Sequence, residues 1–280
     1  GPSYAVPLVG WGGGAWGFGT WGNGATTYSE MRLWNQMNYG EDLVFGPRGG
    51  GLYYWDATGG VTTRGVLLSS LGGTATITIA SPAVVTSTVL YTEGAAISFS
   101  TTGALPTGIT AGTTYYVYNV DGLTFQLLDA AGAVVNTSGS QSGTQSITPV
   151  DVPLYQNNLT VSDTSRFIIV FGTNDYGSST LDPMLIRWSN QDDPYNWTPD
   201  ATNQAGSARL SHGSQIVTTV QTRQEIFVLT DSSAYSLQYL GPPYVWQPQL
   251  LGDNISIISP NAAVIASGVV YWMGVDKFYA

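Results

Sequence analysis

The chain has 280 residues, no cysteine and a formal net charge of −10, with 43% apolar and only 9% charged residues. The absence of cysteine excludes disulfides and thiolate metal sites. The scarcity of lysine and arginine argues against a protein that binds nucleic acid through its phosphates. Apolar residues are too frequent for a disordered chain, no run is long enough for a membrane-spanning helix, and abundant Gly, Thr, Ser, Val and Tyr favour an all-β fold.

Residues 1–30 are rich in glycine and tryptophan, and Trp11, Trp16 and Trp21 recur at five-residue intervals. Glycines between the rings resemble a nucleotide-binding loop, but no strand precedes them and no helical pattern follows. We therefore predict an irregular arm that docks through its aromatic rings, with the three tryptophans as candidate interface residues.

A sequence pattern that predicts two strands then recurs along the chain, each time as an apolar run, a turn and a second run that ends in an aromatic residue. Repeated small sheets are typical of a β-propeller, because one such sheet cannot bury both of its faces and must stack on neighbours. The copies fall short of the roughly six to eight blades of a common ring, so either the blades are few or the propeller is a fragment of a longer one. The predicted strand pairs are 42–45 with 52–55, 167–171 with 184–188, 226–229 with 234–239, and 269–273 with 278 onward.

The segment 72–148 interrupts this series with short Thr/Val/Ile strands and polar turns. Alternation in 113–120 and 123–128 predicts half-buried strands around an Asp121-Gly122 turn. We predict an inserted small β-sandwich, between a first region at 1–71 (arm and first repeat) and a last region at 149–280 (the remaining repeats). Tyr115 and Tyr116 are candidate binding residues, although adjacent strand residues face opposite sides and at most one of them is expected to be exposed.

The acidic pair Asp192-Asp193 lies in RWSNQDDPYNWTP together with Trp197, and these three residues are further candidate binding or interface residues. The spacing loosely resembles the Asp-box turn of sialidase propellers but lacks its glycine. A glycosidase would need two carboxylates about 5–10 Å apart across a cleft, which makes a carbohydrate-active enzyme one hypothesis. His212 is the only histidine, which cannot build a histidine-rich metal site, and no G-x-S-x-G nucleophile elbow occurs. We expect no catalytic residue, no metal and no cofactor.

Long phrases in 182–280, including DPMLIRWSNQDDPYNWTPD, and the upstream LWNQMNYGEDLVFGPRGGGLYYWD resemble tail proteins of short-tailed bacteriophages. The resemblance is to the tail nozzle, or packaged-DNA stabilisation, proteins and covers about residues 1–71 and 149–280. The insert phrase LPTGITAGTTYYVYNVDGLTFQLLDAAG is similar to small β-modules of phage structural proteins.

The resemblance implies a non-enzymatic virion protein that forms a homo-oligomeric ring, commonly of six copies, beside tail adaptor, tube and fibre proteins. Such a ring retains the genome and later conducts DNA without sequence-specific binding, and the inserted domain would project outward. An acidic surface agrees with a wall that repels DNA, although acidity also aids solubility. The alternative is a host-glycan-binding tail module that recognises its receptor through exposed Trp and Tyr.

Overall fold

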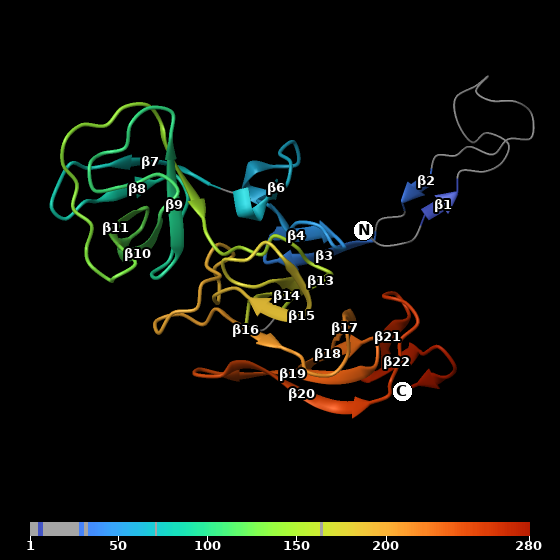
Figure 1. The fold of residues 1–280 in the computed structure, drawn as a ribbon. Coiled ribbons are helices and arrows are strands. Elements are labelled where there is room, and N and C mark those ends of the chain that lie inside the picture. Colours follow the sequence, from blue (N-terminus) through green and yellow to red (C-terminus); the bar gives the residue numbers. More distant parts are fainter. Residues whose placement is uncertain (1–4, 8–27, 31–32, 71, 163–164) are drawn as a thin grey trace, which may run out of the picture.

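The structure is a computed structural model that describes residues 5–7, 28–30, 33–70, 72–162 and 165–280 (Figure 1). Its elements are β-strands and two short 3₁₀ turns, η1 (Ala57–Gly59) and η2 (Leu68–Ser70), which confirms the predicted all-β class. Within these ranges no helix is long and apolar enough to cross a membrane. Strands β1 (Ala5–Pro7) and β2 (Tyr28–Glu30) pair as a small antiparallel sheet.

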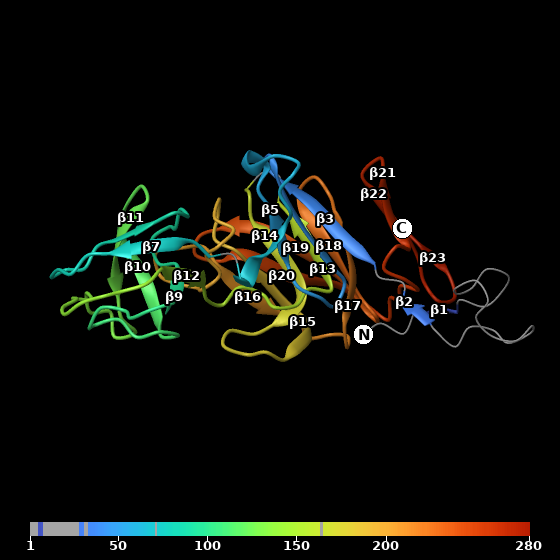
Figure 2. The ribbon, with the colours of Figure 1, turned by 90° about the horizontal axis from the view of Figure 1, so that it is seen from above.

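The described residues also form four antiparallel sheets in which each strand pairs with the next one along the chain; we call these four sheets the sheet stack (Figures 1 and 2). The first sheet holds β3 (Trp34–Tyr39), β4 (Asp42–Pro47), β5 (Tyr53–Trp55) and β6 (Val66–Leu67). The second holds β13 (Asn158–Val161), β14 (Ile168–Asn174), β15 (Leu181–Trp188) and β16 (Gly206–Arg209). The third holds β17 (Ile216–Gln221), β18 (Glu225–Thr230), β19 (Ser233–Gly241) and β20 (Val245–Asp253). The fourth holds β21 (Ala263–Ala266), β22 (Val269–Met273) and β23 (Phe278–Tyr279).

The predicted strand pairs are confirmed as β4–β5, β14–β15, β18–β19 and β22–β23. In the first three sheets the predicted pair is the middle of a four-stranded sheet, so the outer strands are what the sequence patterns missed. Two of the missed strands are short or polar: β6 has two residues, and β16 reads GSAR. Strands with so few apolar positions carry little of the signal on which a pattern depends.

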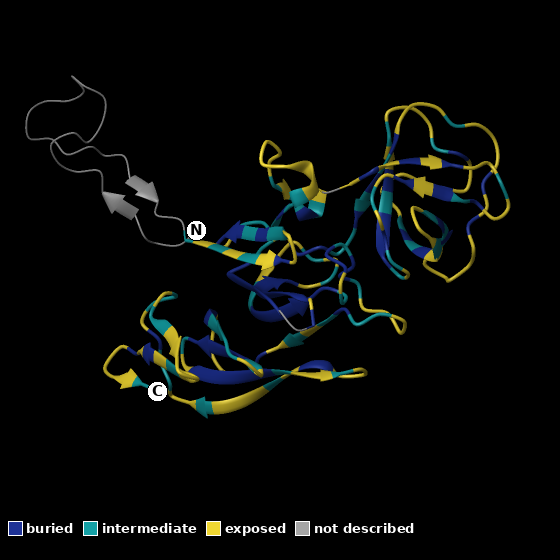
Figure 3. Ribbon diagram, turned by 180° about the vertical axis from the view of Figure 1, so that it is seen from behind, coloured by how far each residue is buried: buried dark blue, intermediate teal, exposed yellow. Residues whose placement is uncertain are grey.

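The sheets stack because their middle strands are apolar on both faces. In β14, Ile168 and Val170 pack in a cluster with residues of the first sheet, whereas Ile169 and Phe171 pack in a cluster with residues of the third sheet. All four side chains are fully buried, and each contributes about 1.5–3 kcal/mol by leaving water. Figure 3 shows this burial concentrated in the interior of the stack.

The first strands of neighbouring sheets lie side by side: β3 beside β13, β13 beside β17, and β17 beside β21. Arg48, in the turn after β4, ties three sheets together at this point. Its Nη1 donates to the carbonyl oxygens of Asn157 at 3.0 Å and Val217 at 2.7 Å, and its Nη2 donates to that of Ile216 at 3.3 Å. Asn158 Nδ2 adds a hydrogen bond to Thr219 Oγ1 at 3.1 Å.

The insert is a closed six-stranded barrel, so the predicted sandwich is wrong. Its strands are β7 (Thr74–Ile77), β8 (Val85–Ser87), β9 (Ala96–Thr101), β10 (Thr114–Asp121), β11 (Thr124–Leu128) and β12 (Gln145–Pro149), in the order β10-β11-β8-β7-β12-β9. The ladder closes because β12 pairs with both β7 and β9. An alternating strand has the same sequence pattern in a sandwich and in a barrel, and only the pairing separates the two.

The turn between β10 and β11 lies one residue later than predicted. Asp121 is still a strand residue and pairs with Thr124, so Gly122 and Leu123 form the turn. Gly122 has φ +59°, a conformation that glycine adopts without steric cost. Aromatic and aliphatic side chains such as Ile97, Phe99, Phe125 and Leu127 fill the barrel.

The barrel lies at one side of the sheet stack, between the first and second sheets in the chain (Figure 1). Its two chain connections run together, because the backbone N–H of Ile147 donates to the carbonyl oxygen of Gly73 at 2.8 Å. The chain therefore leaves the stack and returns to it at nearly the same place.

Stacking on both faces makes a specific prediction for β15. Ile186 is fully buried between the second and third sheets, and replacing it by alanine should lower the free energy of unfolding by about 2–5 kcal/mol. The matched control is Ile258→Ala, at a side chain that is 48% exposed, for which we expect a change within about 0.5 kcal/mol. Equal effects in denaturant titrations of the two variants would contradict this packing.

Candidate functional site

Those predicted aromatic site residues that the structure describes, Tyr115, Tyr116 and Trp197, do not form an exposed row. Trp11, Trp16 and Trp21 lie outside the described residues. Tyr115 is buried in the barrel core and accepts a hydrogen bond on its hydroxyl from Thr110 N at 2.9 Å, whereas Tyr116 is half-buried on the other side of the strand. The expectation that the two tyrosines face opposite sides is therefore confirmed.

Asp192 and Asp193 separate into one exposed and one buried carboxylate. The side chain of Asp192 is 59% exposed and forms an ion pair with Arg166 at 2.8 Å, a surface contact of little energetic weight. Asp193 is only 3% exposed and accepts hydrogen bonds from Thr92 Oγ1 and, at 2.8 Å, from Tyr195 N. With one carboxylate buried in these contacts, the two do not flank an open cleft as a glycosidase pair would.

The contacts of Asp193 fasten the barrel to the sheet stack. Thr92 belongs to the barrel, and Asn196 Nδ2 also donates to its Oγ1 at 3.4 Å. The Tyr195 ring lies between those of Tyr91, 6.2 Å away in the barrel, and Tyr54, 6.0 Å away in the first sheet. We call Tyr91, Thr92, Asp193, Tyr195 and Asn196 the barrel joint.

Burial shifts the pKa values of two side chains in the barrel joint, Asp193 and Tyr195. Loss of water raises the pKa of Asp193, although its hydrogen bonds with Thr92, Tyr195 and Asn196 act in the opposite direction. Burial also raises the pKa of Tyr195 to about 12, and the nearby Asp193 adds to that shift. Trp197, the remaining predicted residue of this segment, is fully buried between the first two sheets and donates from Nε1 to Pro194 O at 2.8 Å.

Arg187 is a buried cation that sequence patterns did not single out. It stands in β15, donates from Nη1 to Asn174 O at 3.1 Å and from Nη2 to Asp151 O, and lies 4.1 Å from the centre of the Tyr176 ring. Asp151 follows the last barrel strand, so this contact fixes the chain as it returns from the barrel. Burial lowers the pKa of Arg187. Its place inside the apolar run MLIRW offered no signal for such a role.

His212 has neighbours that resemble a catalytic triad in composition but not in geometry. Its Nδ1 is 2.9 Å from Ser211 Oγ, and its Nε2 is 3.9 Å from Asp253 Oδ2, too far for a hydrogen bond. The histidine side chain is 50% exposed, whereas a triad needs an oriented imidazole in a site that excludes water. The arrangement does not support nucleophilic catalysis.

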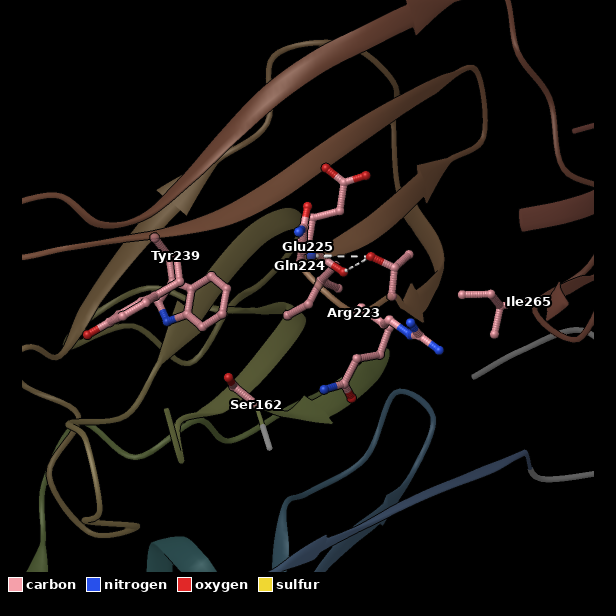
Figure 4. A pocket seen from close by; sticks show the side chains of 10 residues that line it. Ser162, Arg223, Gln224, Glu225, Tyr239 and Ile265 are labelled. Carbon is pink, nitrogen blue, oxygen red and sulfur yellow. Dashed lines mark hydrogen bonds between the residues drawn. The ribbon is translucent and has the colours of Figure 1, made fainter. Parts of the chain in front are cut away.

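A crevice of about 510 Å³ opens at one end of the third sheet (Figure 4). Ser162, directly after β13, and Ile265 of β21 border it, with Tyr239 of β19 on the side opposite Ile265. The β17–β18 turn, with Arg223, Gln224 and Glu225 at its end, contributes a polar wall. Trp246 of β20 also lines the crevice.

The crevice has one fixed polar group and one buried donor. Ser236 Oγ and, at 3.2 Å, Gln238 Nε2 donate to Oε2 of Glu225. Trp246 is 5% exposed, and its indole N–H has no hydrogen-bond partner among the described residues. Sequence reasoning missed this crevice because its residues come from five strands, the β17–β18 turn and the position after β13, which only stacking brings together.

The described residues contain no group of three or more His, Cys, Asp or Glu side chains placed to hold a metal ion. A comparison of the chain with models of protein families and with curated proteins finds no match.

The role of the barrel joint can be tested by substituting Asp193, with its neighbour Asp192 as the control. Replacing Asp193 by alanine leaves the part-buried Thr92 hydroxyl and Tyr195 N–H without this acceptor, and should lower the free energy of unfolding by about 2 kcal/mol. Asp192→Ala removes only an exposed ion pair and should cost about 1 kcal/mol or less. Hydrogen exchange should also accelerate at residues 91–94 in the first variant alone; unchanged exchange there would contradict the joint.

The raised pKa of Asp193 predicts a pH dependence. The folded protein keeps a proton on this carboxyl at a pH where the unfolded chain has released it, so the contribution to stability is largest below the ordinary pKa of about 3.9. That contribution is lost as the pH rises through the folded-state pKa. The stability of the unmodified protein, measured relative to Asp193→Asn, should therefore fall over this interval. A difference that stays constant from about pH 3 to about pH 7 would show that the carboxyl titrates normally.

Proposed function

We propose that this chain is a structural subunit of the tail nozzle of a short-tailed bacteriophage, in which a ring of copies retains the packaged genome and conducts DNA during ejection. The observation that carries the proposal is the architecture. Successive up-and-down sheets stack with their first strands side by side, and a compact barrel interrupts them after the first sheet. We interpret the sheet stack as consecutive blades of a partial β-propeller, which is the fold that the resemblance to nozzle proteins implies.

The charge distribution supports a conduit over a protein that holds DNA. The first strands β3, β13, β17 and β21 contain no charged residue. Four of the seven arginines are engaged within the protein: Arg48 with three carbonyl oxygens, Arg187 in the interior, Arg166 with Asp192, and Arg209 with Asp182 at 2.6 Å. Few cations are left to neutralise phosphates, so DNA passes without being held.

The barrel has the properties of a rigid lateral module in this role. The barrel joint and the Arg187–Asp151 contact hold it at two points, and it lies beside the stack (Figure 1). We propose that it contacts a neighbouring subunit, a fibre protein or the host surface. By the same resemblance we assign the protein to the virion, as a homo-oligomer of about six copies next to the tail adaptor and tube, with a structural and not a catalytic role.

Electron microscopy of the purified chain, alone and mixed with the adaptor and tube proteins of the same virion, tests this proposal. We expect rings with a central channel, with the barrels as lateral densities, and no retention of double-stranded DNA at about 0.15 M salt. Deleting residues 74–147 provides the control that identifies the barrel density. Dispersed monomers that ignore the tail proteins, or tight DNA binding, would overturn it.

A further inference from the structure

We infer that the crevice at the end of the third sheet binds a short neutral saccharide, which stacks on Tyr239 and forms hydrogen bonds with Glu225 and the turn before it. The crevice shares no residue with the barrel joint, and this inference does not depend on the conduit role. It rests on an aromatic wall, a polar wall, a buried donor and the exclusion of other ligand classes.

The aromatic wall is held in place before any ligand arrives. Tyr239 is 38% exposed, yet its ring lies 5.3 Å from that of Trp246 and 5.6 Å from that of Phe167. The Tyr239 hydroxyl also donates to Gln204 Oε1 at 3.3 Å. A ring fixed on three sides loses little conformational entropy on binding. The apolar C–H face of a sugar can pack on its exposed surface.

The polar wall offers the mixed acceptors and donors that sugar hydroxyls require. In the described ranges both side-chain hydrogen bonds to Glu225 end on Oε2, so Oε1 can accept from a ligand hydroxyl. Gln224 and Arg223 are exposed at the same turn and present donors. The turn itself is braced, because Thr222 Oγ1 donates to Glu225 O at 2.8 Å.

Trp246 supplies an independent observation that points to a ligand. Its side chain lines the crevice, and its buried indole N–H has no hydrogen-bond partner among the described residues, which is an unfavourable state for a donor. The nitrogen is closed to water in the structure, so a ligand oxygen can accept from it only after the lining side chains move to admit the ligand. The donor therefore favours an oxygen-rich ligand over a hydrocarbon.

Other ligand classes fit the crevice less well. A phosphorylated or acidic ligand would meet Glu225 beside Arg223, the one cation among the described lining residues, in a chain of net charge −10. A purely apolar ligand would bury the polar turn without satisfying it. The volume of about 510 Å³ lies within the range of small-molecule sites and suits a short saccharide.

The test titrates the full chain with neutral trisaccharides built from glucose, galactose, mannose or N-acetylglucosamine, and with a sialylated trisaccharide, by calorimetry and tryptophan fluorescence. We expect saturable binding of at least one neutral sugar with a dissociation constant on the order of 1 mM or tighter. Tyr239→Ala and Glu225→Gln should each weaken it about tenfold or more. Tyr244→Ala, at a residue that is 70% exposed and outside the crevice, is the matched control and should leave affinity unchanged.

Three outcomes overturn the inference: no neutral sugar binds, only the sialylated sugar binds, or binding survives both crevice substitutions. Circular dichroism establishes that each variant is folded. If Tyr239→Ala does not fold, Glu225→Gln decides, because Glu225 is only partly buried and the amide keeps its size. Loss of sugar binding in a chain that still forms rings would separate this site from the conduit role.

Discussion

The burial of both faces of the middle strands is the constraint on which the rest of the molecule depends. In β14, alternate residues serve two different clusters, so a shift of register by one residue would exchange the side chains facing the first and third sheets. A sheet of this kind has no stable existence alone, since either face would be left in water. The position of each sheet, the convergence of the first strands on Arg48 and the crevice at the end of the third sheet all follow from this stacking.

The connection between barrel and sheet stack relies on polar as well as aromatic contacts. Apolar clusters hold the sheets together, whereas the barrel joint uses a buried carboxylate, a threonine hydroxyl and an asparagine amide beside the tyrosine rings. Directional hydrogen bonds fix an orientation more narrowly than apolar contact does, because a misplaced partner leaves a buried polar group unsatisfied. The acidic pair of the sequence is thereby explained as one residue of a joint and one surface ion pair.

The sequence predicted the parts of the fold that have a local signature. The apolar runs of β14 and β18, the glycine-rich turn at Arg48 and the alternation of β10 were sufficient to place strands and hairpins. It could not predict features that arise from contacts between distant segments. The closure of the barrel depends on β12 pairing with two strands, the burial of Asp193 depends on Thr92, and the crevice depends on stacking. A sequence pattern records the period of a strand but not its partners.

The hydrogen bond between Ile147 and Gly73 bears on how an inserted domain can be gained or lost during evolution. The barrel begins and ends at nearly the same place, so it replaces what could be a short loop between the first and second sheets. Because the barrel folds on itself, the entropic cost of bringing the two ends of this loop together does not grow with the length of the insert. A domain attached in this way can be gained, lost or exchanged without altering the register of any neighbouring sheet. The position between the first and second sheets is thus a permissive insertion point, where the inserted domain can change while the scaffold stays constant.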